Sequence, residues 1–146
     1  MIVAAIALAL LTQQMTQEDM ISEGEQIGRA ATAMGTCKAI GYSVDELAGA
    51  RWAEAYMTRA AESGWTVEVA DNAVDAGSAA EALRLAVPQY DRSLTPSQLR
   101  GLATDFITKV KARCRRLSAE VPGMIRDVDQ GDRNADAQLA IMLRGL

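Results

Sequence analysis

Apolar and small residues recur at every third or fourth position over residues 17–40, and this spacing predicts an amphipathic helix. The stripe consists of Met20, Gly24, Ile27, Ala31, Met34 and Cys37. Thr16 stands before the pattern as an N-cap, and Gly41 stands after it, where a left-handed residue commonly ends a helix. One face of this helix is therefore expected to pack against a core of small side chains.

A second helix is predicted to follow almost at once. Ser43 and Glu46 have the spacing of a capping box, in which each side chain satisfies a free backbone donor of the other residue. The helix is expected to run to about Ser63, where Gly64 stops it. Its apolar face comprises Val44, Ala48, Trp52, Ala55, Tyr56 and Ala60.

A different pattern occupies residues 65–69, where apolar side chains alternate with Thr66 and Glu68. A period of two predicts an extended segment. Because a lone strand leaves its edges unpaired in a small helical domain, we interpret this stretch as an extended connector. A capping box over residues 78–81 then predicts a short third helix, which Pro88 ends.

The clearest helix start in the chain is Thr95. Pro96 follows at the first helical position, and Gln98 can reach back to the cap. The helix is expected to run to about Ser118 and to carry the best apolar stripe of the chain. That stripe consists of Leu99, Leu102, Phe106, Val110, Cys114 and Leu117.

A polar segment, residues 126–136, precedes a final predicted helix over about residues 137–143. The aspartates of this segment suggest a calcium loop. Counted from Asp127, however, glycine is at the fifth position and glutamine at the twelfth, whereas an EF-hand needs glycine at the sixth and glutamate at the twelfth. We therefore single out no metal ligands here.

Together these patterns predict an all-α fold, a small bundle of about four to five helices formed by residues 15–146 as one domain. The chain has 146 residues, of which 49% are apolar, enough for one core. Two Trp, three Tyr and one Phe are its only aromatic residues, while alanine is abundant. A core of this composition favours helices over a β-sandwich.

Residues 1–14 are expected to be separate from this domain. Their ten consecutive apolar residues, 2–11, are too few for a membrane-spanning helix, which needs about 20. A run of this length is typical of an export signal, although no Lys or Arg precedes it. We expect a periplasmic or secreted protein. The alternative is a cytoplasmic protein whose first helix is buried in the core or in a partner.

The chain has a formal net charge of −4 and no histidine. The negative charge argues against nucleic acid as a partner. The lack of histidine excludes serine or cysteine catalysis with a histidine base, and most zinc sites. We therefore expect no catalytic residues of these types and no cofactor.

The two cysteines, Cys37 and Cys114, lie on the apolar stripes of the two best predicted helices. In an exported protein they are expected to form a disulfide. Closing a loop of roughly 78 residues would stabilise the fold by on the order of 4 kcal/mol. The alternatives are a reactive thiol at Cys114, close in sequence to several bases, and two buried free thiols in a cytosolic protein.

Three further groups are candidate sites. The basic cluster, which can bind an acidic partner or complement the helix dipole, consists of Lys109, Lys111, Arg113, Arg115 and Arg116. The aromatic group, which can anchor the core or line a ligand pocket between helices, consists of Trp52, Tyr56 and Trp65. The acidic group, which can supply paired carboxylates, consists of Glu18, Asp19, Glu23 and Glu25.

The function that these observations favour is binding of another protein by an exported helical bundle without catalysis, as an inhibitor, immunity-type, chaperone-like or assembly factor. The alternative is a carrier of a small ligand or metal ion with a pocket at the aromatic group. A third hypothesis is an enzyme that uses carboxylates alone. The sequence predicts neither the oligomeric state nor the identity of the partner.

Overall fold

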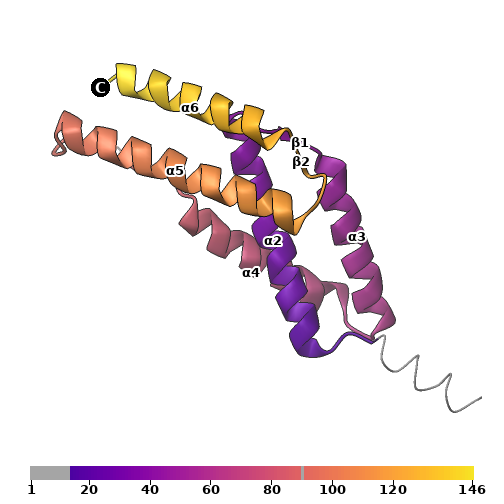
Figure 1. Cartoon of the computed structure of the whole chain (residues 1–146). Coiled ribbons are helices and arrows are strands. Elements are labelled where there is room, and N and C mark those ends of the chain that lie inside the picture. The colour runs from indigo at the N-terminus through magenta and orange to yellow at the C-terminus, as the bar shows by residue number, and fades with distance from the viewer. Residues whose placement is uncertain (1–13, 90) are drawn as a thin grey trace, which may run out of the picture.

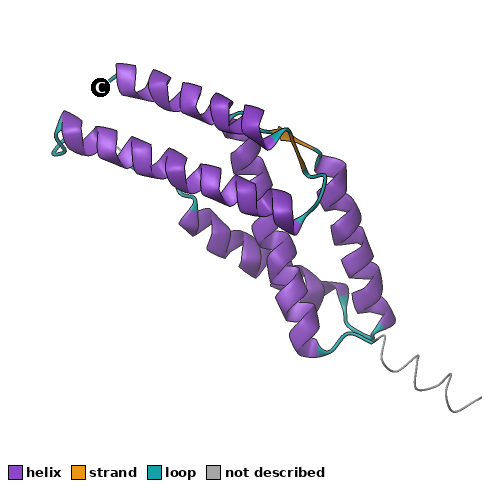
Figure 2. Ribbon diagram, viewed as in Figure 1, coloured by secondary structure: helices purple, strands orange, loops and turns teal. Residues whose placement is uncertain are grey.

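The computed structural model describes residues 14–89 and 91–146, which form five helices and one pair of short strands (Figure 1). The elements are α2 (Gln17–Ile40), β1 (Ser43–Val44), α3 (Glu46–Glu62), α4 (Val67–Arg84), α5 (Pro96–Glu120), β2 (Ile125–Arg126) and α6 (Val128–Arg144). Figure 2 shows how little strand accompanies these helices. The predicted all-α bundle with one disulfide is confirmed. Most of the predicted export signal, residues 1–13, lies outside the described residues.

The ends of the two longest helices are where local sequence predicts them. The Thr16 hydroxyl accepts a hydrogen bond from the backbone N–H of Asp19, and Gly41 follows α2 with a φ of 115°. At the start of α5, Thr95 and Gln98 form the predicted capping box, with Pro96 at the first helical position. α5 ends two residues later than predicted.

The capping box predicted at Ser43 is wrong. Ser43 and Val44 pair instead with Arg126 and Ile125 as an antiparallel ladder, so the N-cap of α3 moves to Asp45. The ladder joins the α2–α3 connection to the α5–α6 connection. It was missed because its two strands are short and lie far apart in the sequence.

The extended connector predicted at residues 65–69 is also wrong, because α4 begins there. Thr66 caps this helix by accepting a hydrogen bond from the Val69 N–H. The alternating valines are not a buried strand face, since Val67 is 63% exposed. The capping box predicted over residues 78–81 is wrong too, because these residues lie within the C-terminal half of the same helix.

α6 is longer at its start than the predicted final helix. Asp127 caps it by accepting a hydrogen bond from the Gln130 N–H, so most of the polar segment is helical and forms no calcium loop.

Gly131 of α6 packs against the ring of Tyr42, where an added Cβ would lie 2.0 Å from a ring carbon. Burial and the hydrogen bond to Asp132 raise the pKa of Tyr42.

α2 is the central helix and contacts each of the other four (Figure 1). Its contact with α4 brings the two backbones together. A Cβ added to Gly28 of α2 would lie 1.9 Å from the Val74 carbonyl oxygen, and a Cβ added to Gly77 of α4 would lie 2.0 Å from the Glu25 carbonyl oxygen. The Ser78 hydroxyl donates to the Gly28 carbonyl at 3.1 Å. Glycine at these two positions therefore permits the close approach.

Two clusters of buried side chains make up the core. The larger one surrounds the disulfide, which joins Cys37 of α2 to Cys114 of α5 with 5.9 Å between Cα atoms. The smaller one consists of Met20, Ile27, Tyr56, Ala60 and Ala70. None of the helices in the described ranges combines the length and hydropathy needed to cross a membrane.

Candidate functional site

The predicted basic cluster does not form one surface. Arg113 is buried, with its side chain 5% exposed, and its Nε donates to Glu81 of α4 at 2.5 Å. Its Nη1 also donates to Glu120 at 3.2 Å. This cation is committed to holding α4 and α5 together, because a buried charge needs such partners.

Two other members of the cluster pair with α6. Lys111 donates to Asp136 at 2.7 Å, and Arg115 pairs with Asp129 and Asp132. These side chains point in different directions around α5, so the sequence alone could not show which of them face a neighbouring helix. The last two members, Lys109 and Arg116, are exposed and form no ion pair within the described part of the chain.

The predicted aromatic group is divided between the core and one surface site. Tyr56 is fully buried, and its hydroxyl donates to the Met20 carbonyl at 2.9 Å. Burial raises the pKa of this phenol. Trp65 donates from its indole to the Met15 carbonyl at 3.3 Å. The core interpretation thus holds for Tyr56, which leaves Trp52 as the member that lines hollows.

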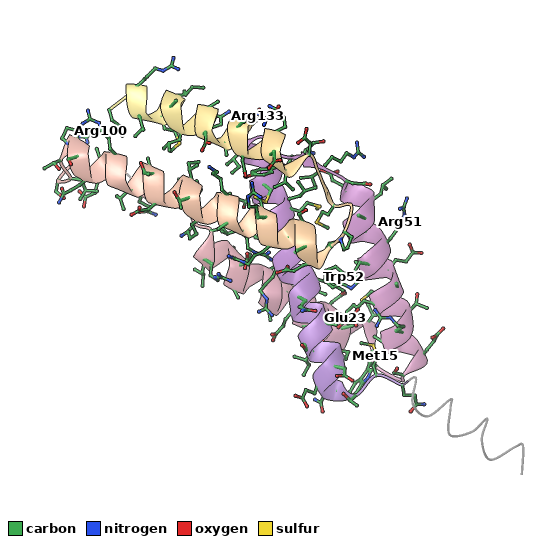
Figure 3. All side chains as sticks on the ribbon, in the orientation of Figure 1. Met15, Glu23, Arg51, Trp52, Arg100 and Arg133 are labelled. Atoms are coloured by element: carbon green, nitrogen blue, oxygen red, sulfur yellow. A yellow bond between two sulfur atoms is a disulfide. The ribbon has the colours of Figure 1, made fainter. Side chains whose placement is uncertain are left out.

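Trp52 separates two hollows between α2 and α3. On one side, its indole N–H donates to Glu23 of α2 at 3.0 Å, beside an open polar hollow of about 460 Å³ (Figure 3). Arg59 also donates to Glu23, and these hydrogen bonds hold the pKa of that carboxyl below its usual value. On the other side lies an apolar hollow of about 240 Å³, lined in part by Met34 and Met124.

The third hypothesis, a carboxylate enzyme, gains nothing from Glu23. A general acid needs a raised pKa, whereas that of Glu23 is lowered. No group of three or more acidic or cysteine side chains placed to hold a metal ion occurs among residues 14–89 and 91–146.

An apolar groove that sequence reasoning missed lies at the far end of the molecule. The outer halves of α5 and α6 run side by side beyond the other helices (Figure 1). Between them and the connector after α4 is a hollow of about 260 Å³ with mainly apolar walls. We call it the α5–α6 groove, and it is lined by Val87, Pro88, Gln89, Leu99, Leu102, Ala103, Met142 and Leu146.

The groove leaves large apolar side chains in contact with solvent. Leu102 is 37% exposed and Met142 is 39% exposed. Leu99 and Leu102 belong to the predicted apolar stripe of α5, which was expected to face the core. The α5 stripe is apolar as predicted, but at this end of α5 it borders a groove between α6 and the connector after α4 and does not face the buried core.

A second missed site combines residues from three helices. Arg113 and Arg116 of α5 lie beside Arg29 of α2 and Arg84 of α4, around a small polar hollow of about 160 Å³. The two α5 residues belong to the predicted basic cluster, whereas Arg29 and Arg84 do not. These positions are too far apart in the chain for any local pattern to connect them.

Comparison of this chain with protein-family models, with curated proteins and with solved structures found no match. The candidate sites are therefore interpreted from their own geometry and chemistry.

Proposed function

We propose that this protein is exported and acts, without catalysis, by binding a partner protein through the α5–α6 groove. The observation that carries the proposal is an apolar groove with partly exposed Leu and Met side chains at one end of a helix pair. Apolar surface that is gathered in one groove, and not scattered singly, is a feature of interaction sites in soluble proteins. Methionine adapts its shape to a bound surface, which suits Met142 to this role.

The occupant that fits the groove best is an amphipathic helix of the partner. Two neighbouring antiparallel helices present a furrow into which a third helix can lay its apolar face. Leu99, Leu102 and Met142 would contact that face. The bound helix would complete a local three-helix bundle around residues that are otherwise half-exposed.

Charge around the groove favours an acidic partner. Arg92, Arg100 and Arg144 lie near this end of the molecule and form no ion pairs in the part of the chain described by the structure (Figure 3 labels Arg100). Asp91 and Asp105 are the acids nearest in sequence to Arg92 and Arg100, and Asp136 is nearest to Arg144. An acidic flank on the partner helix would meet these free guanidinium groups, and its binding should weaken as salt rises.

The disulfide supports the export part of the proposal, because disulfides persist mainly in oxidising compartments. The test is the intact mass of the protein from its native cell fraction, with and without reduction before alkylation. Export predicts loss of the N-terminal apolar segment and two added alkyl groups only after reduction. A full-length mass with both thiols alkylated directly would contradict it.

Partner binding is tested by a photo-crosslinking residue at Met142 in native cells, with Arg133 on the same helix as the control position (Figure 3 labels Arg133). Mass spectrometry identifies a protein captured only from Met142. With that protein purified, Leu102→Glu is expected to weaken binding at least tenfold, because it places a charge in an apolar contact. Leu47→Glu, on exposed α3 surface, should not. Equal affinity of wild type and Leu102→Glu would refute the groove as the site.

The hollows beside Trp52 favour a second candidate function, a small-ligand or metal-ion carrier. Trp65→Phe leaves Trp52 as the one tryptophan, so its fluorescence reports on these hollows alone. Titration with a metabolite and metal-ion panel should change the emission. A flat response to every member of the panel would end this candidate.

A further inference from the structure

Four arginines from three helices surround the hollow of about 160 Å³ between α2, α4 and α5. We call it the arginine pocket, and it is lined by Gln26, Arg29, Arg84, Arg113, Arg116 and Glu120. One carboxylate thus stands among four guanidinium groups in its wall. This is a local reversal of charge in a chain whose formal net charge is −4.

Glu81 of α4 does not line the pocket, but it contacts two of the pocket's arginines, Arg113 and Arg84. It is fully buried, and one of its oxygens accepts the 2.5 Å hydrogen bond from Arg113 Nε. The other oxygen has no hydrogen-bond partner, and Arg84 Nη1 lies 3.6 Å from it. The buried carboxylate therefore holds Arg113 in place with one oxygen, while its second oxygen is left with only the longer contact to Arg84.

Arg113 keeps donors available toward the pocket. A guanidinium group carries five N–H donors. Two hydrogen bonds, to Glu81 and Glu120, are formed by Arg113 within residues 14–89 and 91–146. The Arg113 side chain cannot move away from Glu81 without leaving a buried charge unpaired. Since the same side chain lines the pocket, its N–H groups that are not bonded to Glu81 or Glu120 are held at the pocket wall.

The other three arginines are neutralised only partly. Arg29 lies 3.8 Å from Glu25, a long pair on one helix, and Arg84 reaches Glu81 only at 3.6 Å. Arg116 forms no ion pair with any described residue. Four cations thus face Glu25, Glu81 and Glu120, so the pocket keeps a net positive charge.

We propose that the arginine pocket binds a phosphate group, either as free phosphate or as a monoester. Guanidinium groups match the oxygens of phosphate with paired, charge-assisted hydrogen bonds. The hollow has room for about five water molecules, enough for one such group with part of its hydration. The site is separate from the α5–α6 groove and does not depend on the proposed partner.

The test is isothermal titration of the full chain, with its disulfide formed, at constant ionic strength. Inorganic phosphate is expected to bind once per chain with a Kd of about 1 mM or tighter. Sodium chloride, substituted at the same ionic strength, should give no such isotherm. Absence of saturable phosphate binding would overturn the proposal, provided that phenyl phosphate also fails to bind.

Phenyl phosphate distinguishes the two sources of the group. Tighter binding of phenyl phosphate than of inorganic phosphate would assign the pocket to a phosphate carried on a larger molecule. Tighter binding of inorganic phosphate would assign it to the free ion. Either result requires the same arginines.

Variants locate the binding. Arg116→Gln on α5 and Arg29→Gln on α2 are each expected to weaken phosphate binding about tenfold, because each removes one charge-assisted contact. Arg51→Gln is the matched control: it removes the same charge from an exposed position on α3, which contributes no residue to the pocket (Figure 3 labels Arg51). If Arg51→Gln weakens binding as much as Arg116→Gln, the effect is one of overall charge and the pocket is refuted. Thermal unfolding monitored by circular dichroism checks that all three variants are folded.

Discussion

The disulfide makes a quantitative prediction about stability. Cys37 and Cys114 are separated by 77 residues in sequence, and both are fully buried. In the chain-entropy model a cross-link lowers the entropy of the unfolded chain by 2.1 cal/mol/K plus 1.5R ln n, where n is the loop length. For this loop the sum is about 15 cal/mol/K, which corresponds to about 4.5 kcal/mol at 25 °C. That is a large share of the stability of a typical domain, 5–15 kcal/mol.

Substitution of either cysteine removes the stabilisation that the cross-link provides and also leaves a gap in the core. A double-mutant cycle separates the two effects. Cys37→Ala and Cys114→Ala should each cost about 4.5 kcal/mol plus a packing loss of their own. The double variant loses the cross-link once only, so the sum of the single effects should exceed the double effect by about 4.5 kcal/mol.

The assay is urea unfolding of the four proteins, followed by circular dichroism. The slope of the free energy of unfolding with urea should also rise in every variant, because the unfolded chain without its cross-link exposes more surface. If the sum of the two single effects exceeds the double effect by less than about 1 kcal/mol, the prediction is refuted, because the two cysteines are then not joined in the folded protein.

Two further predictions concern α2. Gly77→Ala on α4 should destabilise the protein by about 1–3 kcal/mol, because the added Cβ would lie 2.0 Å from the carbonyl oxygen of Glu25 on α2. Gly35→Ala on α2, which has open space around it, should instead stabilise the protein by up to about 1 kcal/mol. Urea unfolding compares the two variants, and equal changes in the free energy of unfolding would contradict the backbone contact. Glu23→Gln should lower the free energy of unfolding by about 1 kcal/mol at pH 7, and this difference from the wild type should vanish in acid. The folded-state pKa of Glu23 is lowered, so its contribution is present above the ordinary pKa of 4.5 and is lost as pH falls through the folded value. A cost that is the same at pH 7 and pH 3 would contradict this assignment.

Helix ends were predictable where a few neighbouring residues determine them. Thr16 and Thr95 cap their helices through hydrogen bonds that span three residues, and Gly41 adopts its left-handed conformation as expected. The disulfide was predictable because both cysteines lie on apolar stripes of long helices. α4 was not, because its buried face consists largely of alanine and glycine and contains the charged residue Glu81.

The candidate sites depended on contacts that the sequence does not encode locally. An apolar stripe predicts which face of α5 is apolar, but it does not predict whether another helix covers Leu102. Arg113 and Arg115 are two residues apart, yet the first is buried against α4 and the second pairs with α6. Only the packing of three helices brings Arg29 and Arg84 beside the α5 arginines.

The central position of α2 has a consequence for how this sequence tolerates change. Within 14 residues the helix and its cap meet four different elements: Gly28 meets α4, Met34 lies across a hollow from α3, Cys37 is bonded to α5, and Gly41 meets Asn134 of α6. A substitution at any of these four positions displaces a different neighbour, so the contact positions of this stretch are constrained from several sides, whereas exposed positions such as Gly35 are not. Evolutionary constraint should therefore concentrate on small residues of one helix, while exposed positions of α3 and α6 diverge, and relatives of this protein would be recognisable by α2 before any other segment.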